Sequence, residues 1–338
     1  MPTTLQDIAD RLNVSIATVS RALRDAPGVS VATRKQVLQV AEEMGYRPNV
    51  LARRLQKQRT ETIGFIIPTF GPRFSDPFFS ELLTGIGNEA AEHEYDLLVS
   101  TRAPGPEELR GYERMVRERR VDGLLVVRTR LDDPRIAYLV EHKFPFVAYG
   151  RADLDFEFPY VDVDGRHGMR ELTLHLLEGG HRRIGYVSAP WKLMFAHYRY
   201  GGYLEALEAR GVSQDESLVV TGGMTEASGY EAGRILLSQV ELPTAIIACN
   251  DLMAIGVMRA VREAGMEVGS DVAVAGFDDI PLAKMTHPSL TTVRQPIYQI
   301  GRQICAMLLT LLAGDSLDQA HRLLQPELIV RQSTSPAP

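Results

Sequence analysis

Cysteine is almost absent from this sequence: Cys249 and Cys305 are the only two in 338 residues, and both have apolar neighbours. This excludes a disulfide framework and a cysteine zinc site, and it is typical of a reducing compartment. Long hydrophobic runs are also lacking, because stretches such as 63–67 and 245–249 end far short of the ~20 residues that a membrane-spanning helix needs. Met1 is followed by polar residues rather than by a basic and then an apolar segment. We therefore expect no secretory signal, no membrane contact and a cytoplasmic location.

Enzyme signatures are missing as well. The sequence has no G-x-x-x-x-G-K-[ST] phosphate loop and no G-x-S-x-G nucleophile elbow. The glycine pattern at 85–90 imitates a dinucleotide fingerprint, but it lies inside a predicted helix and is interpreted as helix packing. The acidic run at 162–165 lacks the later ligands of a calcium loop, and the eight histidines have no metal-binding spacing. We expect neither catalysis, nor a metal, nor another cofactor.

The charge is divided unevenly along the chain. Residues 1–59 contain ten Lys/Arg against five Asp/Glu, a balance of +5, although the whole chain is at −6. The remainder holds 27 Lys/Arg and 38 Asp/Glu, a balance of −11. A basic beginning and an acidic remainder indicate that the first 60 residues bind a polyanion and that the rest has another task.

The first 48 residues have the pattern of three short helices. Thr4 can cap the first, and Asn13 stands where a tight turn between helices needs a left-handed residue. Ser15 can cap a second helix at about 16–23, and a third apolar stripe ends at Gly45. This spacing predicts an all-α domain of three short helices.

A short segment separates these helices from the remainder. Residues 50–56 can form little more than one turn of helix, and 57–62 are polar without a core pattern. We therefore divide the chain into a three-helix domain at 1–48, a short helix and linker at 49–61, and a large domain at 62–338.

From residue 62 onward, short apolar strands alternate with amphipathic helices. This alternation predicts doubly wound parallel sheets with helices on both faces, and eight strands suggest two similar subdomains with a ligand cleft between them. The expected strands are 62–68, 96–100, 123–127, 146–149, 184–188, 218–221, 245–248 and 272–276, and the expected helices include 79–94, 166–178, 200–210 and 251–263.

Several sequence blocks in this order resemble the lactose-repressor/galactose-repressor family of bacterial transcription regulators. Two departures are visible, since Asn13 stands where many members have Gly and Gly165 where Asn is common. The blocks are 4–9, 14–23, 45–49, 52–55, 76–79, 122–123, 180–184, 250–251, 276–279 and 290–295.

The resemblance implies that 1–48 form an all-α helix-turn-helix DNA-binding domain and that 49–61 hold a hinge helix and linker. It further implies that an α/β, two-lobed, periplasmic-binding-protein-like effector domain follows this DNA-binding head. It places the N-lobe at about 62–160 plus 293–322 and the C-lobe at about 161–292 plus 323–338. The function it implies is that of a homodimeric, sequence-specific repressor on pseudo-palindromic operator DNA, switched by a small carbohydrate. A solute-binding receptor without a DNA-binding role, or a regulator responding to a purine or another non-sugar metabolite, are the alternatives.

The resemblance also assigns residues to the DNA. Ile16, Ala17 and Arg21 match the base-reading positions of the second helix, although Arg21 could also be a solvated helix end. Leu55 matches a residue that inserts into the minor groove, although residues 51 and 55 could instead pack on the head. The complete expected set is Thr4, Ser15, Ile16, Ala17, Thr18, Ser20, Arg21, Arg34, Asn49, Ala52, Arg53 and Leu55.

For the effector, the resemblance places aromatic and polar residues in the cleft. Trp191 is a candidate for stacking on a sugar ring or, alternatively, a core aromatic, while Phe79 and Asp164 have structural alternatives in helix packing and strand-end capping. Effector binding would reorient the lobes and make or melt a paired hinge helix. The expected set is Phe78, Phe79, Asp164, Trp191, Arg199, Met224, Asn250, Asp278 and Gln295.

Overall fold

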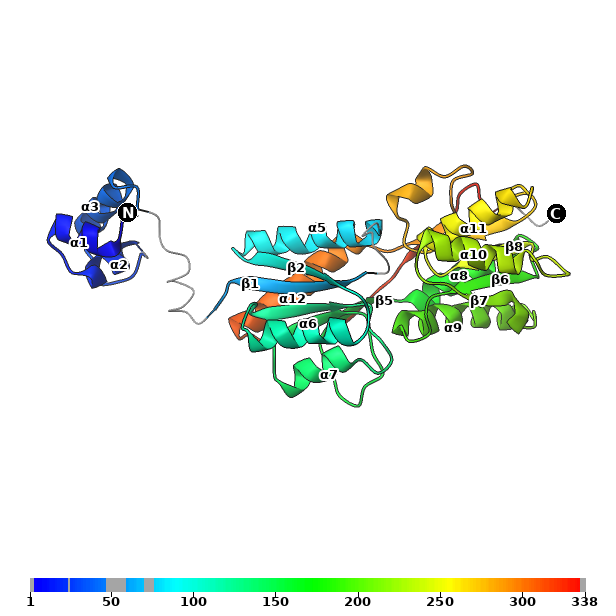
Figure 1. The fold of residues 1–338 in the computed structure, drawn as a ribbon, viewed down its shortest axis with the longest axis horizontal. Coiled ribbons are helices and arrows are strands. Elements are labelled where there is room, and N and C mark those ends of the chain that lie inside the picture. The colour runs from blue at the N-terminus through cyan, green and yellow to red at the C-terminus, as the bar shows by residue number, and fades with distance from the viewer. Residues whose placement is uncertain (1–2, 24, 47–58, 70–75, 335–338) are drawn as a thin grey trace. The chain divides into compact units, whose positions relative to one another are not determined.

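The computed structural model describes residues 3–23, 25–46, 59–69 and 76–334. The chain forms two compact units, Met1–Arg59 and Thr60–Pro338 (Figure 1). The expected hinge helix and the residues Asn49, Ala52, Arg53 and Leu55 lie outside the described residues, so those expectations stay predictions. In the described part of the chain, no helix is both long and apolar enough to cross a membrane.

The first unit contains three helices, α1 (Leu5–Leu12), α2 (Ile16–Leu23) and α3 (Val31–Glu43). The Thr4 hydroxyl accepts a hydrogen bond from the backbone N–H of Asp7, and the Asp7 carboxylate accepts one from the backbone N–H of Thr4, so the first helix begins in a capping box. Asn13 has φ 52° and ψ 47°, the left-handed conformation that the tight turn to α2 requires. One buried residue from each helix, namely Ile8, Val19 and Val37, meets the others in a small core.

The N-lobe of the second unit is built on a parallel sheet with the strand order β11-β5-β4-β3-β1-β2. Helices α5 and α12 pack on one face of the sheet, and α6 and α7 pack on the other. The bounds are β1 Thr62–Pro68, α5 Pro77–Glu92, β2 Asp96–Arg102, α6 Pro106–Arg117, β3 Gly123–Val127, α7 Pro134–Glu141, β4 Phe146–Tyr149, β5 Tyr160–Val163, α12 Ile297–Ala313 and β11 His321–Leu324.

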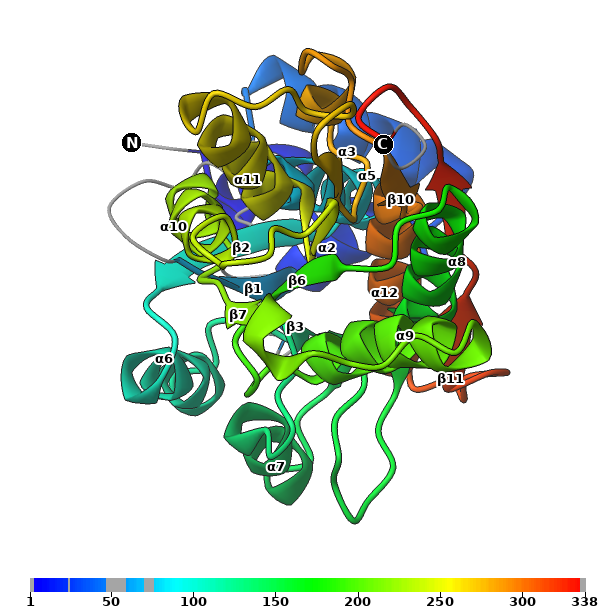
Figure 2. The same ribbon diagram turned by 90° about the vertical axis from the view of Figure 1, so that its right-hand side faces the viewer.

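The C-lobe contains a second parallel sheet, ordered β7-β6-β8-β9. Helices α8 and α9 cover one face, and α10 and α11 cover the other (Figure 2). The bounds are α8 Gly165–Glu178, β6 Ile184–Ser188, α9 Met194–Ala209, β7 Val219–Thr221, α10 Glu226–Leu236, β8 Ala245–Ala248, α11 Asp251–Glu263 and β9 Ala273–Ala275, with short 3-10 helices at Glu216–Leu218 and Pro281–Lys284.

The chain crosses between the lobes three times. It passes from β5 into α8, from β9 through β10 (Thr292–Arg294) into α12, and from β11 into β12 (Glu327–Ile329), and β10 and β12 pair with each other antiparallel. The expected lobe boundaries, after residue 160 and after residue 322, fall within β5 and β11. Both strands belong to the N-lobe sheet because they pair with each other there.

The glycines at 85–90 lie within α5, and helix α12 packs very closely against Gly85. A Cβ atom on Gly85 would lie 2.2 Å from the carbonyl oxygen of Tyr298, and one on Gly301 would lie 2.4 Å from that of Leu82. These glycines therefore allow the backbones of α5 and α12 to approach, as the packing interpretation of this motif expects.

Candidate functional site

Helix α2 presents one face to solvent and buries the other. Ile16 is 44% exposed, and Ala17 and Arg21 are exposed with it, whereas Val19 and Ala22 are buried in the head. A helix needs such an outward face to place side chains against base edges in the major groove. The expected base-reading positions therefore lie together on the accessible surface of the second helix.

The hydroxyl residues of the head have local structural roles. Besides the Thr4 cap of α1, the Ser15 hydroxyl accepts a hydrogen bond from the backbone N–H of Thr18 at 3.1 Å, and the two hydroxyls lie 2.9 Å apart. These contacts fix the beginning of α2, where helix N–H groups are suited to a phosphate. Ser20 is half-buried on the same helix.

Arg34, expected to contact a phosphate, has partners within the head. Its guanidinium makes an ion pair with Asp25 and donates to the carbonyl of Ala26 at 3.2 Å, so its charge is already compensated inside the head. An arginine in this position stabilises the loop between α2 and α3. In this arrangement it is not an uncompensated phosphate-binding cation.

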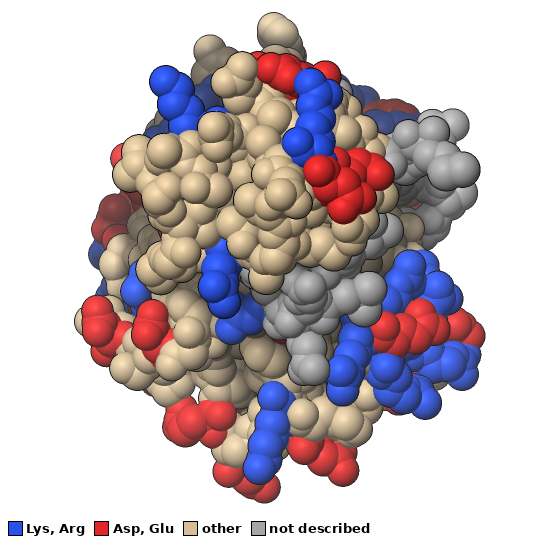
Figure 3. Space-filling view, turned by 90° about the vertical axis from the view of Figure 1, so that its left-hand side faces the viewer, with Lys and Arg blue, Asp and Glu red and all other residues tan. Residues whose placement is uncertain are grey.

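The positive charge of the first 59 residues is concentrated near their end. Residues 1–46 contain five Lys/Arg and five Asp/Glu, whereas 47–59 contain five Lys/Arg and no acid. Figure 3 views both units from one side, and on that face Lys and Arg side chains are interspersed with Asp and Glu. By sequence, the net positive charge of the first 59 residues lies in 47–59, which favours attraction of that segment to a polyanion.

The second unit contains a cleft between its lobes at the carboxyl ends of the N-lobe strands, the usual ligand position in such sheets. The lining residues surround about 680 Å³ of space that includes open solvent, of which about 60 Å³ is cavity that a water-sized sphere can enter. The lining residues are Asp76, Phe78, Val127, Arg128, Thr129, Tyr149, Gly150, Arg151, Asp162, Val163, Gly165, Phe195, Tyr198, Arg199, Met224, Asp278 and Gln295.

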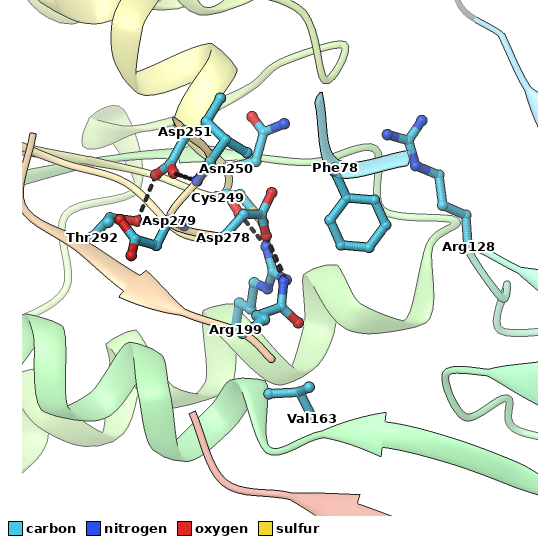
Figure 4. Close-up of polar contacts among 12 residues, drawn as sticks. Phe78, Arg128, Val163, Arg199, Cys249, Asn250, Asp251, Asp278, Asp279 and Thr292 are labelled. Carbon is cyan, nitrogen blue, oxygen red and sulfur yellow. Dashed lines mark hydrogen bonds and ion pairs between the residues drawn. The ribbon is translucent and has the colours of Figure 1, made fainter. Parts of the chain in front are cut away.

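Arg199 projects from α9 into the cleft, and Figure 4 shows it pointing toward Asp278. Its Nη1 donates to the carbonyl of Cys249, and its Nη2 lies 3.5 Å from a carboxylate oxygen of Asp278. The guanidinium carbon lies 3.7 Å from the centre of the Phe277 ring. Burial acts to lower the pKa of Arg199, but Asp278 together with Cys249, Tyr149 and Tyr186 outweighs burial, so this pKa is above its ordinary value.

Asp278 is held at the cleft by the strand that crosses between the lobes. Its N–H donates to the carbonyl of Val293 at 2.8 Å, and its φ of 121° is a conformation rare for residues with a side chain. The next residue, Asp279, also has a positive φ of 56°, and two arginines bind its carboxylate: Arg294 at 2.8 Å and Arg331 at 2.5 Å. This double ion pair stabilises the strained turn that directs Asp278 into the cleft.

A hydrogen-bond chain joins Asp278 to the N-lobe. The amide of Gln295 donates to Asp278 at 2.5 Å, and the Tyr149 hydroxyl donates to the amide oxygen of Gln295 at 2.7 Å. Burial raises the pKa of Asp278 to about 7, with Arg199 acting in the opposite direction and Asp76 adding to the rise. Tyr149 also stacks on Phe78, with ring centres 5.9 Å apart.

The N-lobe contributes two further ion pairs that the sequence interpretation missed. Arg128 binds Asp76 at 2.6 Å, and Arg151 binds Asp162 at 2.7 Å. Tyr198 from the C-lobe lies under Arg151, with the guanidinium carbon 3.7 Å from the ring centre. Arg128 directly follows β3, and Arg151 stands two residues after the end of β4, so the rule that ligand residues follow strands could have found both.

Four of the nine expected effector residues do not line the cleft. Phe79 is 1% exposed and packs on Phe65 and Phe78, because α5 turns it toward the sheet. Asp164 caps α8 by accepting from the N–H of His167, and Asn250 caps α11 by accepting from that of Met253. Trp191 packs edge-on against Tyr200, 5.1 Å between ring centres. The other five line it, namely Phe78, Arg199, Met224, Asp278 and Gln295.

A three-helix head with an outward-facing second helix, and a two-lobed unit with a polar and aromatic cleft, define a DNA-binding regulator with a small-molecule-binding domain. Residues 4–49 match the model of the bacterial regulatory proteins of the lacI family, and residues 173–334 match that of a periplasmic binding protein-like domain. The chain belongs to the lacI family and is a transcription regulator rather than an enzyme.

Full-length relatives and solved structures support this membership. The HTH-type transcriptional repressor CytR of Escherichia coli K12 is 34% identical over 99% of this chain and 97% of its own. The regulator CelR of Thermobifida fusca is 35% identical over 98% of each. A CelR–cellobiose complex has a TM-score of 0.76 at 33% identity, covering 98% of this chain and 99% of that one. The lac repressor dimer bound to operator and the anti-inducer ONPF has a TM-score of 0.87 at 27% identity, and the match covers 99% of this chain and 100% of that one.

Proposed function

We propose that this protein is a homodimeric repressor that acts in the cytoplasm, binds a pseudo-palindromic operator through α2, and changes its operator affinity when a small carbohydrate binds in the cleft. The observation that carries the effector assignment is the cleft itself. It combines the guanidinium of Arg199, the carboxylate of Asp278 and the amide of Gln295 with aromatic rings from both lobes.

This combination suits a sugar ring. A carboxylate or a planar guanidinium can bind two neighbouring hydroxyl groups, and an aromatic face covers the apolar C–H side of the ring. Phe78 and Tyr149 come from the N-lobe, and Phe195 and Tyr198 come from the C-lobe. The structurally similar CelR binds cellobiose in a solved complex, which supports the same ligand class here.

The proposed head contacts are Ile16, Ala17 and Arg21 with base edges, and Ser15, Thr18 and Ser20 with phosphates. The first group is exposed on α2; Ser15 and Thr18 lie at or near the beginning of this helix, and Ser20 lies half-buried in its middle. A homodimer presents two such helices to two half-sites, and its symmetry matches a pseudo-palindromic operator. The lac repressor dimer in its operator complex has the same architecture, which supports this arrangement.

The coupling between cleft and operator needs an element with two states. Gln295 follows β10, one of the three crossings between the lobes, and its amide bonds Asp278. A ligand that changes these bonds would change the relative orientation of the lobes and, through residues 49–61, the pairing of the two hinge segments. Both induction and corepression are consistent with this scheme.

A thermal-shift screen of the full chain against mono- and disaccharides tests the effector assignment, because a ligand raises stability by mass action. For a sugar that binds, Arg199→Ala should weaken binding by about 10- to 100-fold, since a lost charged hydrogen bond costs ~1.5–3 kcal/mol. It should also remove the sugar's effect on operator binding.

Arg234→Ala is the matched control, because Arg234 is exposed on α10 and pairs with Glu231 away from the cleft. It should leave sugar binding unchanged. A response to the sugar that survives Arg199→Ala at ordinary concentrations would show that the effector binds elsewhere.

A further inference from the structure

The charged residues of the cleft balance one another. Among the described residues that line it, three are arginines and three are aspartates, and the remaining lining residues carry no formal charge. The described part of the cleft wall is therefore formally neutral. It is neither a cationic pocket for anions nor an anionic pocket for amines.

Each arginine is paired with an aspartate. Arg128 binds Asp76 at 2.6 Å, Arg151 binds Asp162 at 2.7 Å, and Arg199 lies 3.5 Å from Asp278. The six side chains are at most 21% exposed. In such a water-poor setting, an additional charge interacts strongly with every fixed charge nearby.

The titration behaviour of these groups agrees with a site that does not favour additional charge. Burial raises the pKa of Asp76 and of Asp162 above the ordinary range, and it lowers the pKa of Arg128 below its ordinary value. For these three groups the charged form is thus disfavoured, and the ion pairs compensate for burial only in part, whereas the pKa values of Arg151 and Arg199 stay above the ordinary value despite burial.

We propose, on the basis of the effector site proposed above, that the effector is an uncharged polyhydroxyl compound, a free sugar or a neutral glycoside, and that the cleft rejects phosphate esters and sugar acids. A phosphate would have to displace an aspartate from its arginine, which leaves a buried carboxylate unpaired beside another anion. A hydroxyl group can accept from an arginine and donate to an aspartate without disturbing the pair.

Of the three arginines, Arg151 is the one that an anionic ligand could most easily reach. It is the most exposed of the three arginines, at 21%, and its Nη2 has no hydrogen-bond partner among the described residues. An anionic group would therefore find its best partner here. Asp162 already occupies one edge of this guanidinium and the Tyr198 ring covers a face, so Arg151 is not a surplus cation.

Calorimetric titration of the full chain at pH 8 tests the proposal, because Asp278 is mainly ionised there. The probes are glucose, galactose, maltose and cellobiose, each compared with its phosphate ester and its uronate. For the parent sugar that binds, we expect both anionic derivatives to bind on the order of 100-fold more weakly, since opposing like charges costs several kcal/mol. An anionic derivative that binds as tightly as its parent overturns the proposal.

A pair of charge variants tests the cause. Asp162→Asn keeps the side-chain shape and leaves Arg151 uncompensated, so it should reduce the discrimination against the anion by about tenfold. Arg151→Gln leaves Asp162 uncompensated and should increase the discrimination. If both variants discriminate as the wild type does, charge pairing is not the reason and the proposal fails.

The outcome also separates this proposal from the assignment of the effector site. If an anionic derivative binds and the binding depends on Arg199, the site is correct and only the neutrality is wrong. If neither the neutral sugars nor their derivatives bind, or if the binding affinity is unchanged in Arg199→Ala, the effector assignment fails and this proposal fails with it.

Discussion

Single residues carry the recognition chemistry of both units, and their surroundings decide what they can do. Arg21 and Arg34 are both arginines of the head. Arg21 is exposed on α2, whereas Arg34 is held by Asp25 and a backbone carbonyl. In the cleft, Arg199 reaches Asp278 only because two positive-φ residues turn the chain there. The sequence identifies these residues as candidates, but the groups that they contact in the folded protein determine their roles.

Arg21→Ala should cost about 1 to 3 kcal/mol of operator affinity if Arg21 reads a base, without changing thermal stability, because its side chain is exposed. Gel-shift titrations with operator and with random DNA measure the effect. Lys35→Ala is the control, since Lys35 is also exposed in the head, on α3. An equal loss on both DNAs would show that Arg21 only neutralises phosphate.

Asp278 should make the folded state less stable as the pH rises from about 4 to 7. In this window the folded protein, with the Asp278 pKa at about 7, keeps a proton that the unfolded chain, at 3.8, has lost. The loss amounts to on the order of 4 kcal/mol and is complete above pH 7.

Urea unfolding at pH 5 and pH 8 checks this for the wild type and for Asp278→Asn, which cannot titrate. The free energy of unfolding of the wild type, relative to that of the variant, should be lower at pH 8 than at pH 5. Parallel pH profiles would contradict the assignment of a raised pKa to Asp278.

At the scale of elements, a short antiparallel bridge joins the lobes at the cleft. The N–H of Leu131 donates to the carbonyl of Lys192 at 3.1 Å, and the N–H of Met194 donates to that of Thr129 at 2.9 Å. Leu193, the N-cap residue of α9, provides no side-chain cap, so the N-lobe carbonyl satisfies the first turn of this helix instead. The helix that carries Arg199 thus begins at a contact with the other lobe.

A buried ion-pair network holds the N-lobe side of this bridge. Arg135 is fully buried and binds Asp133 at 2.6 Å and Glu108 at 2.5 Å. It also donates to the carbonyls of Val127 and Arg128 at the end of β3. The loop that leads from β3 to the bridge is therefore rigid, which fits it to transmit a movement between the lobes.

Locking this bridge should uncouple the effector from the operator. Arg130 and Leu193 face each other as a non-hydrogen-bonded antiparallel pair, a spacing that a disulfide can span. In Arg130→Cys/Leu193→Cys, the oxidised protein should keep one operator affinity with or without the sugar. The reduced form of the same protein should respond and is the internal control. A normal response after oxidation would mean that the lobes do not separate here.

At the scale of the whole molecule, the DNA-binding head and the effector unit are separate bodies joined by the segment 47–59. This segment has half of the Lys/Arg residues found in the first 59 positions and none of the acids. Residues 50–56 are too few to hold a helix alone in water. Both features suit a segment that orders on a polyanion, so we expect the switch to act here.

Leu55→Ala should weaken operator binding and reduce the DNA bend, because an apolar wedge offsets the cost of unstacking a base step only on bent DNA. Sugar affinity and dimerisation should not change. Circular-permutation gel shifts measure the bend, and Leu51→Ala is the control for simple loss of packing. A variant with normal bend and affinity would refute the wedge.

The secondary structure followed from the sequence wherever an apolar run was continuous. β1, β3, β4, β6 and β8 have the expected bounds, because four to seven residues, mostly apolar, between polar turns leave little alternative. β5, β10, β11 and β12 were not expected. They are three- or four-residue strands with polar residues among them, and their partners lie far away in the sequence, as with β5 and β11.

The sequence by itself also determined the family, the helix-turn-helix with its capping Thr4 and its turn at Asn13, and the cleft residues Arg199 and Asp278. Only the tertiary structure decided that Arg128, Tyr149 and Arg151 join them and that Asn250 does not. The reason is physical. A cap or an apolar stripe acts over a few neighbouring residues, whereas the cleft depends on which strand ends meet across two lobes, and no local pattern encodes that meeting.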